Sequence, residues 1–249
     1  MPGRRRQGVH WRGRGSTVGG VQQLPQADCI LLPLPLEQSG LPLAQLLGMA
    51  KPGALALGGK VTDSARTIAR AAGVELVDYF ARPELTVYNA IPTAEGCIGI
   101  LLERRSRTLW GAAVLVLGFG PVGRALAVRL AALGARVTVA ARRPVQRAMA
   151  EEQGLRAVPL TDLAAAFDTV VNTIPAPVLT AAVLAALPKG CLIVDLASKP
   201  GGTDFAAARR LGHTALHALS LPTVWAPETA GEALARTVQT ILQEREEKI

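Results

Sequence analysis

The chain has 249 residues, of which 49% are hydrophobic and 4% aromatic, so its core must consist mainly of Ala, Leu and Val. This length allows one large or two modest domains. The formal net charge is +8, but five of the 27 basic residues lie before Gln26, where no acidic residue occurs. The remainder has no basic stripe interleaved with aromatic residues, which argues against a nucleic-acid-binding protein.

The cysteines and histidines indicate neither a disulfide framework nor a metal site. Cys29, Cys97 and Cys191 are far apart in apolar surroundings, which is typical of a protein from a reducing cytoplasm. His213 and His217 are four residues apart, but no carboxylate or thiol partner accompanies them. No signal peptide is apparent, and no apolar run reaches the ~20 residues that cross a bilayer. We therefore expect a cytoplasmic chain without a metal and without a membrane as partner.

The first part of the chain predicts a small α/β domain. Residues 1–27 are rich in Arg and Gly without apolar periodicity, so we expect them to be disordered or atypical. The elements predicted after them are a strand at 28–35, a strand at 54–57, a helix at 62–72 and a strand at 75–79. Because strand, helix and strand in this order form half of a parallel sheet, residues 28–92 predict a flavodoxin-like N-terminal substrate domain. Pro92 and Thr93 suit the start of a helix, which we expect to bridge two domains over residues 93–109.

The central feature of the sequence is an apolar run that passes directly into Gly-x-Gly-x-x-Gly and then into a helix-forming segment, over residues 112–127. This context favours a dinucleotide-binding loop. In such a loop Gly118 makes the tight turn, Gly120 lets a pyrophosphate approach the backbone, and Gly123 lets the helix pack close to the strand. The loop residues expected to bind the cofactor are Gly118, Phe119, Gly120, Pro121, Val122 and Gly123. The alternative is a glycine-rich turn that binds nothing.

The segment that follows predicts a doubly wound parallel sheet, that is, a Rossmann domain over residues 110–225. After the glycine loop, strands are predicted at 136–140, 157–160, 169–173, 192–196 and 213–219. Helices are predicted at 145–154, 163–167, 179–187, 205–211 and 229–247. We expect the C-terminal helix, within residues 226–249, to pack back toward the first domain.

Two strand ends of this domain should contact the cofactor. An NAD enzyme usually has Asp or Glu at the end of the second strand, but this chain has Arg142 and Arg143. Two guanidinium groups can bind a 2′-phosphate, so NADP is favoured over NAD, unless both arginines are simply solvated. The fourth strand leads into Thr173, Ile174 and Pro175, which should flank the nicotinamide. The alternative there is a strand end that is closed by proline.

The fifth strand leads into a loop with groups suited to a carboxylate ligand. Lys199 is the first candidate for a substrate anchor, and Ser198 and the backbone N–H groups of Gly201 and Gly202 are further donors. The alternative is that the lysine is plain surface charge.

Three polar residues of the bridging segment are expected near the site of hydride transfer. They are Asn89, Thr93 and Glu95. A partly desolvated Glu95 would suit general acid–base catalysis. Its alternative role is that of an acid in the first turn of a helix, where it complements the helix dipole.

Several of these segments together resemble the A subunit of dipicolinate synthase, the sporulation enzyme of endospore-forming bacteria. The stretches that carry the resemblance are residues 88–96 (YNAIPTAEG), 117–123 (LGFGPVG), 140–143 (AARR), 172–179 (NTIPAPVL), 195–205 (DLASKPGGTDF) and 226–231 (APETAG). The stretches 88–96 and 195–205 are much more specific than the glycine loop. More distantly, the two-domain plan resembles that of the 2-hydroxy-acid dehydrogenases.

The resemblance implies oxidation of a dihydro- or hydroxytetrahydro-pyridine-2,6-dicarboxylate to the aromatic dicarboxylate in the mother cell of a sporulating bacterium. Hydride would pass to NAD(P), the partner would be a flavoprotein-like B subunit, and a homo-oligomer is left open. The two carboxylates would be held by Lys199, Ser198, Thr93 and the N–H groups around Gly201 and Gly202.

The sequence departs from the family pattern at three places. Residues 1–27 do not resemble the opening strand and glycine turn of the family, so we expect the first domain to be truncated. Ser220 stands where a glycine beside Leu-Pro is expected, and Glu228 replaces an expected lysine.

Two other functions stay open. One is a different NADP-linked dehydrogenase for a hydroxy or keto acid, which commonly needs an imidazole, and only His213 and His217 are available in the second domain. The other is a cofactor-binding protein that stabilises or regulates a partner without catalysis.

Overall fold

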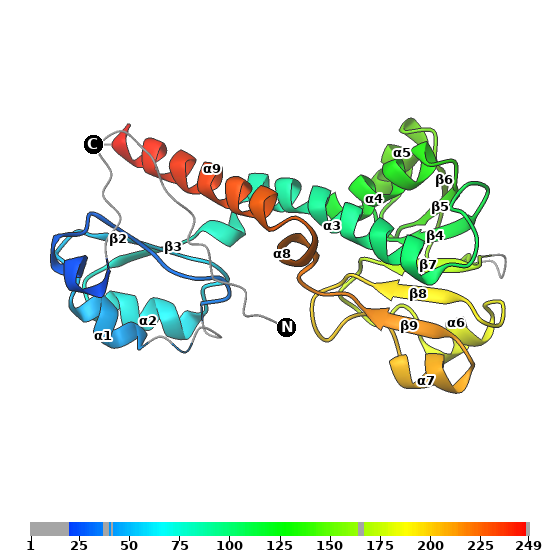
Figure 1. Ribbon diagram of the computed structural model, residues 1–249, viewed down its shortest axis with the longest axis horizontal. Helices are drawn as coiled ribbons and strands as arrows, with labels where there is room; N and C mark the ends of the chain where they lie inside the picture. Colours follow the sequence, from blue (N-terminus) through cyan, green and yellow to red (C-terminus); the bar gives the residue numbers. More distant parts are fainter. Residues whose placement is uncertain (1–19, 37–39, 41, 164–166, 248–249) are drawn as a thin grey trace. The chain divides into compact units, whose positions relative to one another are not determined.

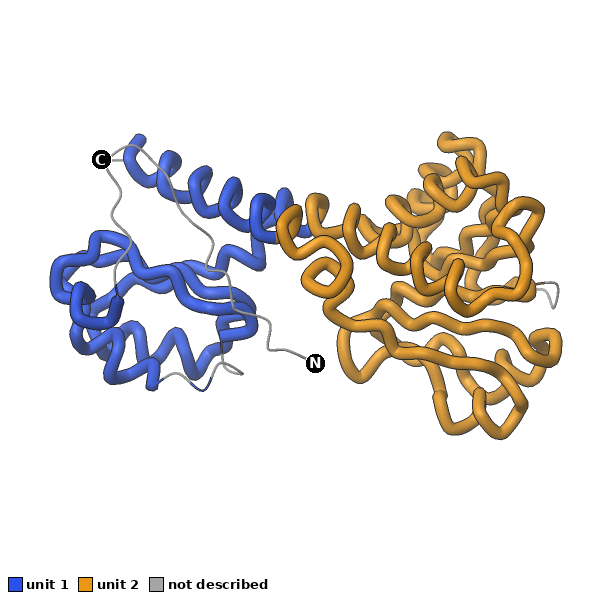
Figure 2. The backbone as a smooth tube through the Cα atoms, in the orientation of Figure 1, with its two compact units in different colours: residues 1–86, 231–249 blue, residues 87–230 orange. Residues whose placement is uncertain are grey.

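The computed structural model describes residues 20–36, 40, 42–163 and 167–247, which form two compact units (Figure 1). Figure 2 shows the division: unit 1 comprises Met1–Thr86 and Gly231–Ile249, and unit 2 comprises Val87–Ala230. Both borders fall inside helices, whereas the sequence predicts them at the ends of a bridging helix (93–109) and before the C-terminal helix, between residues 225 and 226. Residues 1–19, which belong to the predicted atypical start, and most of the predicted helix at 163–167 lie outside the described residues.

Unit 1 is built around a small sheet that is parallel, as predicted, and has the strand order β1-β2-β3. Its strands are β1 (Cys29–Leu31), β2 (Leu55–Gly58) and β3 (Glu75–Asp78). Its shorter helices are η1 (Val21–Gln26), α1 (Leu43–Gly48), α2 (Asp63–Ala71) and η3 (Tyr79–Ala81). The α2 helix begins where the sequence predicts, because the Thr62 hydroxyl accepts a hydrogen bond from the Ala65 N–H at 3.3 Å. Leu47 of α1, Ala69 of α2 and Leu76 of β3 are buried in one apolar cluster.

Unit 2 contains a six-stranded parallel sheet in the order β6-β5-β4-β7-β8-β9. Its strands are β4 (Ala113–Leu117), β5 (Arg136–Ala140), β6 (Arg156–Val158), β7 (Thr169–Asn172), β8 (Leu192–Asp195) and β9 (Thr214–His217). Its shorter helices are α4 (Pro121–Ala132), α5 (Pro144–Glu152), α6 (Ala181–Ala185), α7 (Phe205–Arg210) and α8 (Leu221–Trp225). The chain winds from β4 outward to β6 on one side and to β9 on the other. The predicted fold class, a doubly wound parallel sheet preceded by a smaller α/β unit, is confirmed.

A long helix, α3 (Pro83–Arg104), corrects the helix predicted at 93–109. It begins at Pro83, has Glu84 in its first turn and continues through Pro92. Proline at the first position and an acid in the first turn both favour a helix start, so the signal at Pro83 outweighs the one at Pro92. Ala94 and Leu101 of this helix are fully buried in the core of unit 2. Burial of this face offsets the cost of a proline inside the helix.

Helices cover both faces of the larger sheet (Figure 1). Val114 and Val116 of β4 belong to a core cluster that includes buried residues of α3, α4 and α5. Leu115 and Leu117 belong to a second cluster with buried residues of α6 and α7. Because successive side chains of a strand point to opposite faces, an uninterrupted apolar strand such as β4 is buried on both sides.

Among the described residues, α3 is the one helix that is long and apolar enough to span a membrane by length and composition. Core helices pass the same test, and the part of α3 that belongs to unit 2 packs against α8. A Cβ atom at Gly96 or Gly99 would come within 2.9 Å and 2.3 Å of the Trp225 ring of α8. These contacts and the burial of Leu101 show that one face of α3 belongs to the core of unit 2.

The last helix, α9 (Pro227–Glu246), corresponds to the helix predicted at 229–247. Its C-terminal part belongs to unit 1. There the Arg82 guanidinium donates to both carboxylate oxygens of Glu244, at 2.9 Å and 2.6 Å. Arg245 forms an ion pair with Glu75 of β3. These bonds fasten the end of α9 to the small sheet.

Ser220, directly before α8, has a left-handed backbone conformation with φ 58° and ψ 28°. This conformation costs a non-glycine residue about 1–2 kcal/mol, and the side chain is exposed. We expect Ser220→Gly to raise the free energy of unfolding by roughly 0.5–1 kcal/mol in chemical denaturation, because the relief of strain exceeds the added entropy of the unfolded chain. Ser106→Gly, at an exposed serine without a positive φ, should be neutral or destabilising. If both substitutions changed the free energy of unfolding equally, the backbone at Ser220 would not be strained.

Arg105, directly after α3, lies almost buried beside the start of β7, with 8% of its side chain exposed. It donates to the two carboxylate oxygens of Asp168 at 2.8 Å and 3.3 Å. Burial alone would raise the pKa of Asp168, but the hydrogen bonds from Arg105 and Thr169 outweigh it, so the pKa lies below its usual value. The pair should therefore stabilise unit 2 most where the carboxyl group is ionised.

Asp168→Asn should lower the free energy of unfolding by about 1–2 kcal/mol at neutral pH, since it leaves the nearly buried guanidinium without its counter-charge. A folded-state pKa below the unfolded value gives stability that is present above the unfolded pKa and is lost as the pH falls through the folded pKa. The difference between wild type and variant, measured by urea denaturation, should therefore shrink from about pH 5 downward. Asp162→Asn, at an exposed aspartate, is the control. A difference that does not depend on pH would argue against the ion pair.

Candidate functional site

The carboxyl ends of the central strands form one edge of the larger sheet. In register, the residues that lie side by side along this edge are Ala140, Leu117, Asn172, Asp195 and His217. The winding direction changes between β4 and β7. Ligands of doubly wound sheets bind at such a switch point, beyond the carboxyl ends of the strands. The topology therefore places the candidate site above β4 and β7.

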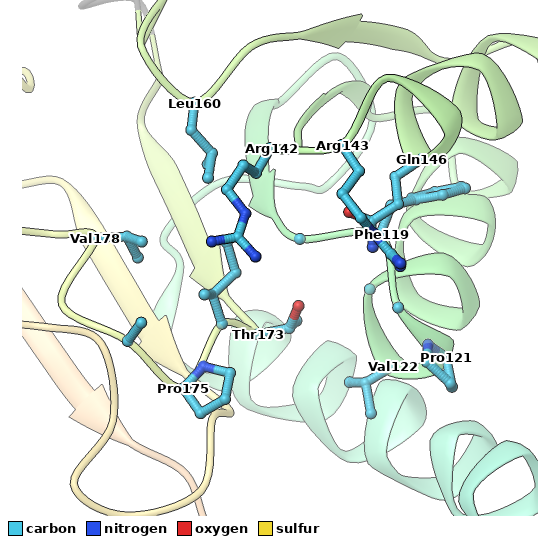
Figure 3. A pocket seen from close by; sticks show the side chains of 15 residues that line it. Phe119, Pro121, Val122, Arg142, Arg143, Gln146, Leu160, Thr173, Pro175 and Val178 are labelled. Atoms are coloured by element: carbon cyan, nitrogen blue, oxygen red, sulfur yellow. The ribbon is translucent and has the colours of Figure 1, made fainter. Parts of the chain in front are cut away.

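A pocket of about 560 Å³ lies at this switch point (Figure 3). Three segments line it: the β4–α4 turn, the region from the end of β5 into α5 and on past β6, and the segment after β7. The lining residues are Gly118, Phe119, Gly120, Pro121, Val122, Gly123, Arg142, Arg143, Gln146, Leu160, Thr173, Ile174, Pro175, Ala176 and Val178. The structure thus brings together all eleven residues that the sequence predicts around the cofactor. Gln146, Leu160, Ala176 and Val178 were not predicted, because no local motif marks them.

The three glycines of the loop have different surroundings. Gly118 has φ +92°, and a Cβ atom there would lie 2.6 Å from the Thr173 hydroxyl oxygen. A Cβ atom at Gly123 would lie 2.2 Å from the carbonyl oxygen of Gly118. At Gly120 it would meet nothing within 4 Å. The fold therefore requires glycine at 118 and 123, whereas Gly120 leaves space for a ligand to approach the backbone.

The start of α4 is suited to an anion. Gly120 is the N-cap, Pro121 occupies the first turn, and no acidic residue lies in that turn. The free N–H groups and the positive end of the helix dipole therefore favour a phosphate. On the opposite wall, the Thr173 hydroxyl donates to the Leu117 carbonyl at 2.8 Å, which fixes the segment after β7 against the glycine turn.

Two arginines give the pocket its charge. Figure 3 shows the side chain of Arg142 extending into the pocket, while Arg143 lies beside Phe119 and Gln146. The guanidinium of Arg147 donates to the carbonyls of Ala141 and Arg142, both at 3.0 Å, and so braces this turn. None of the described residues that line the pocket is acidic. The open space at the glycine turn, the helix start and the two guanidinium groups fit a dinucleotide.

The loop after β8 is organised by a buried carboxylate that was not predicted from the sequence. Asp195 is fully buried and accepts hydrogen bonds from four donors. These are the Asn172 amide at 2.9 Å, the Ala197 N–H at 3.0 Å, the Gly202 N–H at 2.8 Å and the Thr203 hydroxyl at 2.7 Å. The available signal in the sequence was a polar residue directly after apolar residues at the end of two strands, Asn172 in β7 and Asp195 in β8.

The sequence predicts that the N–H groups of Gly201 and Gly202 donate to a substrate carboxylate, but in the structure both donate within the loop. The Gly201 N–H donates to the Ser198 carbonyl at 2.8 Å, and the Gly202 N–H donates to Asp195. Because the loop closes on itself, neither N–H group is free for a substrate carboxylate in this conformation. The side chains of Ser198 and Lys199 are exposed, and their groups remain available for a ligand.

The three candidate residues of the bridging segment lie on α3. The Thr93 hydroxyl donates to the Asn89 carbonyl at 2.6 Å, one turn earlier in the helix. Glu95 is 61% exposed on its side chain, and its carboxylate lies 3.8 Å from the Arg129 Nε. It is therefore neither a desolvated acid nor a first-turn acid here, because the helix starts at Pro83. In the part of the chain that the structure describes, no hydrogen bond or ion pair joins these three residues to the loop after β8.

The two histidines of unit 2 have structural contacts. His213 is 8% exposed, and its Nε2 lies 2.9 Å from the Leu184 carbonyl oxygen. His217 Nε2 lies 2.8 Å from the Ala197 carbonyl oxygen, and its ring stacks on Phe205. Within the described ranges, no three His, Cys, Asp or Glu side chains are grouped as metal ligands.

This fold and this pocket define a dinucleotide-binding protein of the dehydrogenase type. Residues 100–199 match the family described as "D-isomer specific 2-hydroxyacid dehydrogenase, NAD binding domain". The match spans the five strands from β4 to β8, and with them the glycine turn. Unit 2 therefore contains a nicotinamide-dinucleotide-binding domain.

The chain belongs to the family of dipicolinate synthase A subunits. It is 42% identical over 182 residues to the A subunit of dipicolinate synthase from Bacillus subtilis (strain 168), a match that covers 71% of this chain and 61% of that protein. A crystal structure of the A subunit from Bacillus subtilis superposes with a TM-score of 0.84 at 32% identity, covering 96% of this chain and 86% of that one. The corresponding structure from Bacillus halodurans gives 0.80 at 35% identity, covering 86% and 79%. The chain thus spans about three fifths of its curated relative in the sequence match.

Proposed function

We propose that the chain is the dinucleotide-binding subunit of a dipicolinate synthase. In this reaction dihydrodipicolinate, formed from 4-hydroxytetrahydrodipicolinate by loss of water, loses a hydride and a proton and becomes pyridine-2,6-dicarboxylate. The hydride passes to NAD(P)⁺ and the proton to the medium, so that the reaction is balanced. The observation that carries the proposal is the pocket at the β4–β7 switch point, in a chain that belongs to this family.

The chain's own residues bind and orient the reactants. The glycine turn and the start of α4 would hold the pyrophosphate, Arg142 and Arg143 the 2′-phosphate of NADP, and the segment after β7 the nicotinamide. The bound dinucleotide supplies the hydride acceptor. Lys199, with Ser198 beside it, is the proposed anchor of one substrate carboxylate. Because the product ring is aromatic, the main task of the protein is to place the substrate ring against the nicotinamide.

A second polypeptide is part of the proposal, because the curated relative is named as the A subunit of its synthase. A flavoprotein-like B subunit is the proposed partner. The chemistry requires a soluble dicarboxylate and a soluble dinucleotide, so we propose that the protein works in the cytoplasm. In a spore-forming bacterium this would be the mother cell.

The test combines the purified chain, with and without the B subunit, with freshly generated precursor and either nicotinamide cofactor. We expect the absorbance of the aromatic product to rise in equal amount with reduced cofactor. Product from this chain alone would exclude a purely regulatory role. No product under any of the four conditions would contradict the proposal.

Lys199→Met is the matched variant for this assay, because it keeps the length of the side chain and removes the ammonium group. We expect its KM for the precursor to rise about 10-fold or more, since one charge-assisted hydrogen bond is lost, while dinucleotide binding is unchanged. An unchanged KM would remove Lys199 from the proposed site.

A further inference from the structure

Two loops of unit 2 are joined by one buried polar pair, Asn172 and Asp195. They are the last residues of β7 and β8, they face each other in register, and both are fully buried. The Asn172 amide donates to the Asp195 carboxylate at 2.9 Å. Buried polar groups cost stability unless their hydrogen bonds are made, and an apolar pair would fill the same space without that demand.

On one side, Asn172 holds the segment that lines the dinucleotide pocket. Its side-chain carbonyl accepts from the Ile174 N–H at 3.0 Å, and its amide group donates to the Ile174 carbonyl, also at 3.0 Å. Ile174 is a lining residue of the pocket. The orientation of this amide therefore fixes the backbone of the pocket wall.

On the other side, Asp195 closes the loop that carries Ser198 and Lys199. One carboxylate oxygen accepts from the Ala197 N–H, which precedes these residues, and the other accepts from the Gly202 N–H and the Thr203 hydroxyl, which follow them. All four partners of the carboxylate are donors, so a group that only accepts is required at this position. The loop is thus held at both ends by one side chain.

The two loops also touch directly through Gly202. A Cβ atom there would lie 2.5 Å from the Ala176 carbonyl oxygen and 2.6 Å from that of Ile174. The Gly202 carbonyl accepts from the Val178 and Leu179 N–H groups at 3.0 Å and 2.9 Å. These two hydrogen bonds do not involve the Asp195 side chain, so we expect them to keep the pocket segment in place when Asp195 or Thr203 is changed.

We propose that Asp195, held by Asn172, is a positioning residue that presents Ser198 and Lys199 at a fixed place beside the dinucleotide pocket. The inference rests on the proposed function, because it assigns these two side chains to the substrate. Asp195 itself is fully buried and acts through the loop, and it does not touch either reactant.

The experiment compares variants that remove one acceptor or one donor of this arrangement. Asp195→Asn keeps the shape but points an NH₂ group at N–H or O–H donors. Thr203→Val is a milder change that removes one of the four hydrogen bonds, and Thr203→Ser restores the hydroxyl. Thr237→Val in α9 is the matched control, because it removes another hydrogen-bonded hydroxyl, which donates to the Ala233 carbonyl at 3.0 Å in unit 1.

Three quantities are measured on the full chain: the KM for dihydrodipicolinate, the Kd for reduced dinucleotide by fluorescence, and the melting temperature. We expect the KM to rise about 10-fold or more in Asp195→Asn and about 3- to 10-fold in Thr203→Val, as loss of one hydrogen bond implies. The Kd should stay within about 3-fold in both. Thr203→Ser and Thr237→Val should keep the wild-type KM.

The outcomes separate this inference from the proposed function. If the wild type neither turns over the precursor nor binds pyridine-2,6-dicarboxylate, the proposed function fails and the inference falls with it. If the wild type is active but KM and Kd rise together with a fall in melting temperature, Asp195 is only part of the core and the inference is overturned. An unchanged KM in Thr203→Val, or no recovery in Thr203→Ser, would also overturn it.

Discussion

Gly120→Ala is expected to fold as the wild type does and to bind the dinucleotide roughly 10- to 100-fold more weakly. The backbone at Gly120 is extended, with φ −79° and ψ −171°, a conformation that any residue adopts. The added methyl group meets no protein atom within 4 Å, and Gly120 lines the pocket, so we expect the methyl group to take space that a ligand would use. There it would displace a pyrophosphate from the N–H groups at the start of α4. The measurement is a fluorescence titration with reduced cofactor, beside a thermal melt.

The matched variant is Gly123→Ala, which should act mainly on stability because its methyl group would lie 2.2 Å from a backbone oxygen. Backbone cannot give way as a flexible side chain can, so we expect a loss of about 2–4 kcal/mol in the free energy of unfolding, together with weaker binding. The contrast between the two variants is the diagnostic result. If Gly120→Ala binds the cofactor with wild-type affinity, no pyrophosphate lies on this turn.

The second large effect concerns the choice of cofactor. Arg142→Gln should weaken NADP binding about 10- to 100-fold and change NAD binding by less than about 3-fold, because a guanidinium–phosphate contact is charge-assisted and NAD lacks the 2′-phosphate. Arg143→Gln should act in the same direction. Both arginines line the pocket, and Arg142 extends into it (Figure 3). Titration of each variant with both cofactors gives the answer.

Arg136→Gln is the control for this series, because Arg136 is an exposed arginine at the opposite end of the same strand, β5. It should leave both affinities unchanged. An equal loss of NAD and NADP affinity in Arg142→Gln would mean that the guanidinium binds a part that the two cofactors share. Tighter binding of NAD than NADP by the wild type would remove the assignment altogether.

The larger sheet and its pocket could be predicted from sequence because their signals are local. The apolar run of β4, the glycine turn and the start of α4 follow one another without a break, so a short window contains the whole motif. Each further strand is a short apolar run that ends in polar or proline residues. The parallel order then brings the strand ends to one edge, which is why the predicted cofactor residues line a common pocket.

The elements that were missed have weak or competing local signals. The short helices α1 and α8 have no hydrogen bond from a capping side chain, and α8 follows a serine in the left-handed region. At α3 two prolines compete as the helix start, and burial of the face with Ala94 and Leu101 decides for the earlier one. Such burial depends on contacts with residues far away in the chain, which a short stretch of sequence does not reveal.

The part of the site that could not be predicted depends on hydrogen bonds between distant residues. Whether the Gly202 N–H is free depends on Asp195, and the role of Asp195 depends on its register with Asn172 in the neighbouring strand. The sequence predicted Lys199 as a substrate anchor on this loop, and the structure shows that Lys199 is exposed. It could not show that the backbone donors are already used within the protein.

The indole of Trp225 also bears on how relatives of this chain should be recognised. It fills a notch that Gly96 and Gly99 leave on α3, and Gly96 is the last residue of the stretch 88–96 that carries much of the family resemblance. Glycine at position 96 therefore has a steric reason, because any larger side chain would collide with the Trp225 ring. A homologue could retain Gly96 after losing its activity, so a search for active members of the family is better based on Lys199, the proposed substrate anchor, than on this glycine.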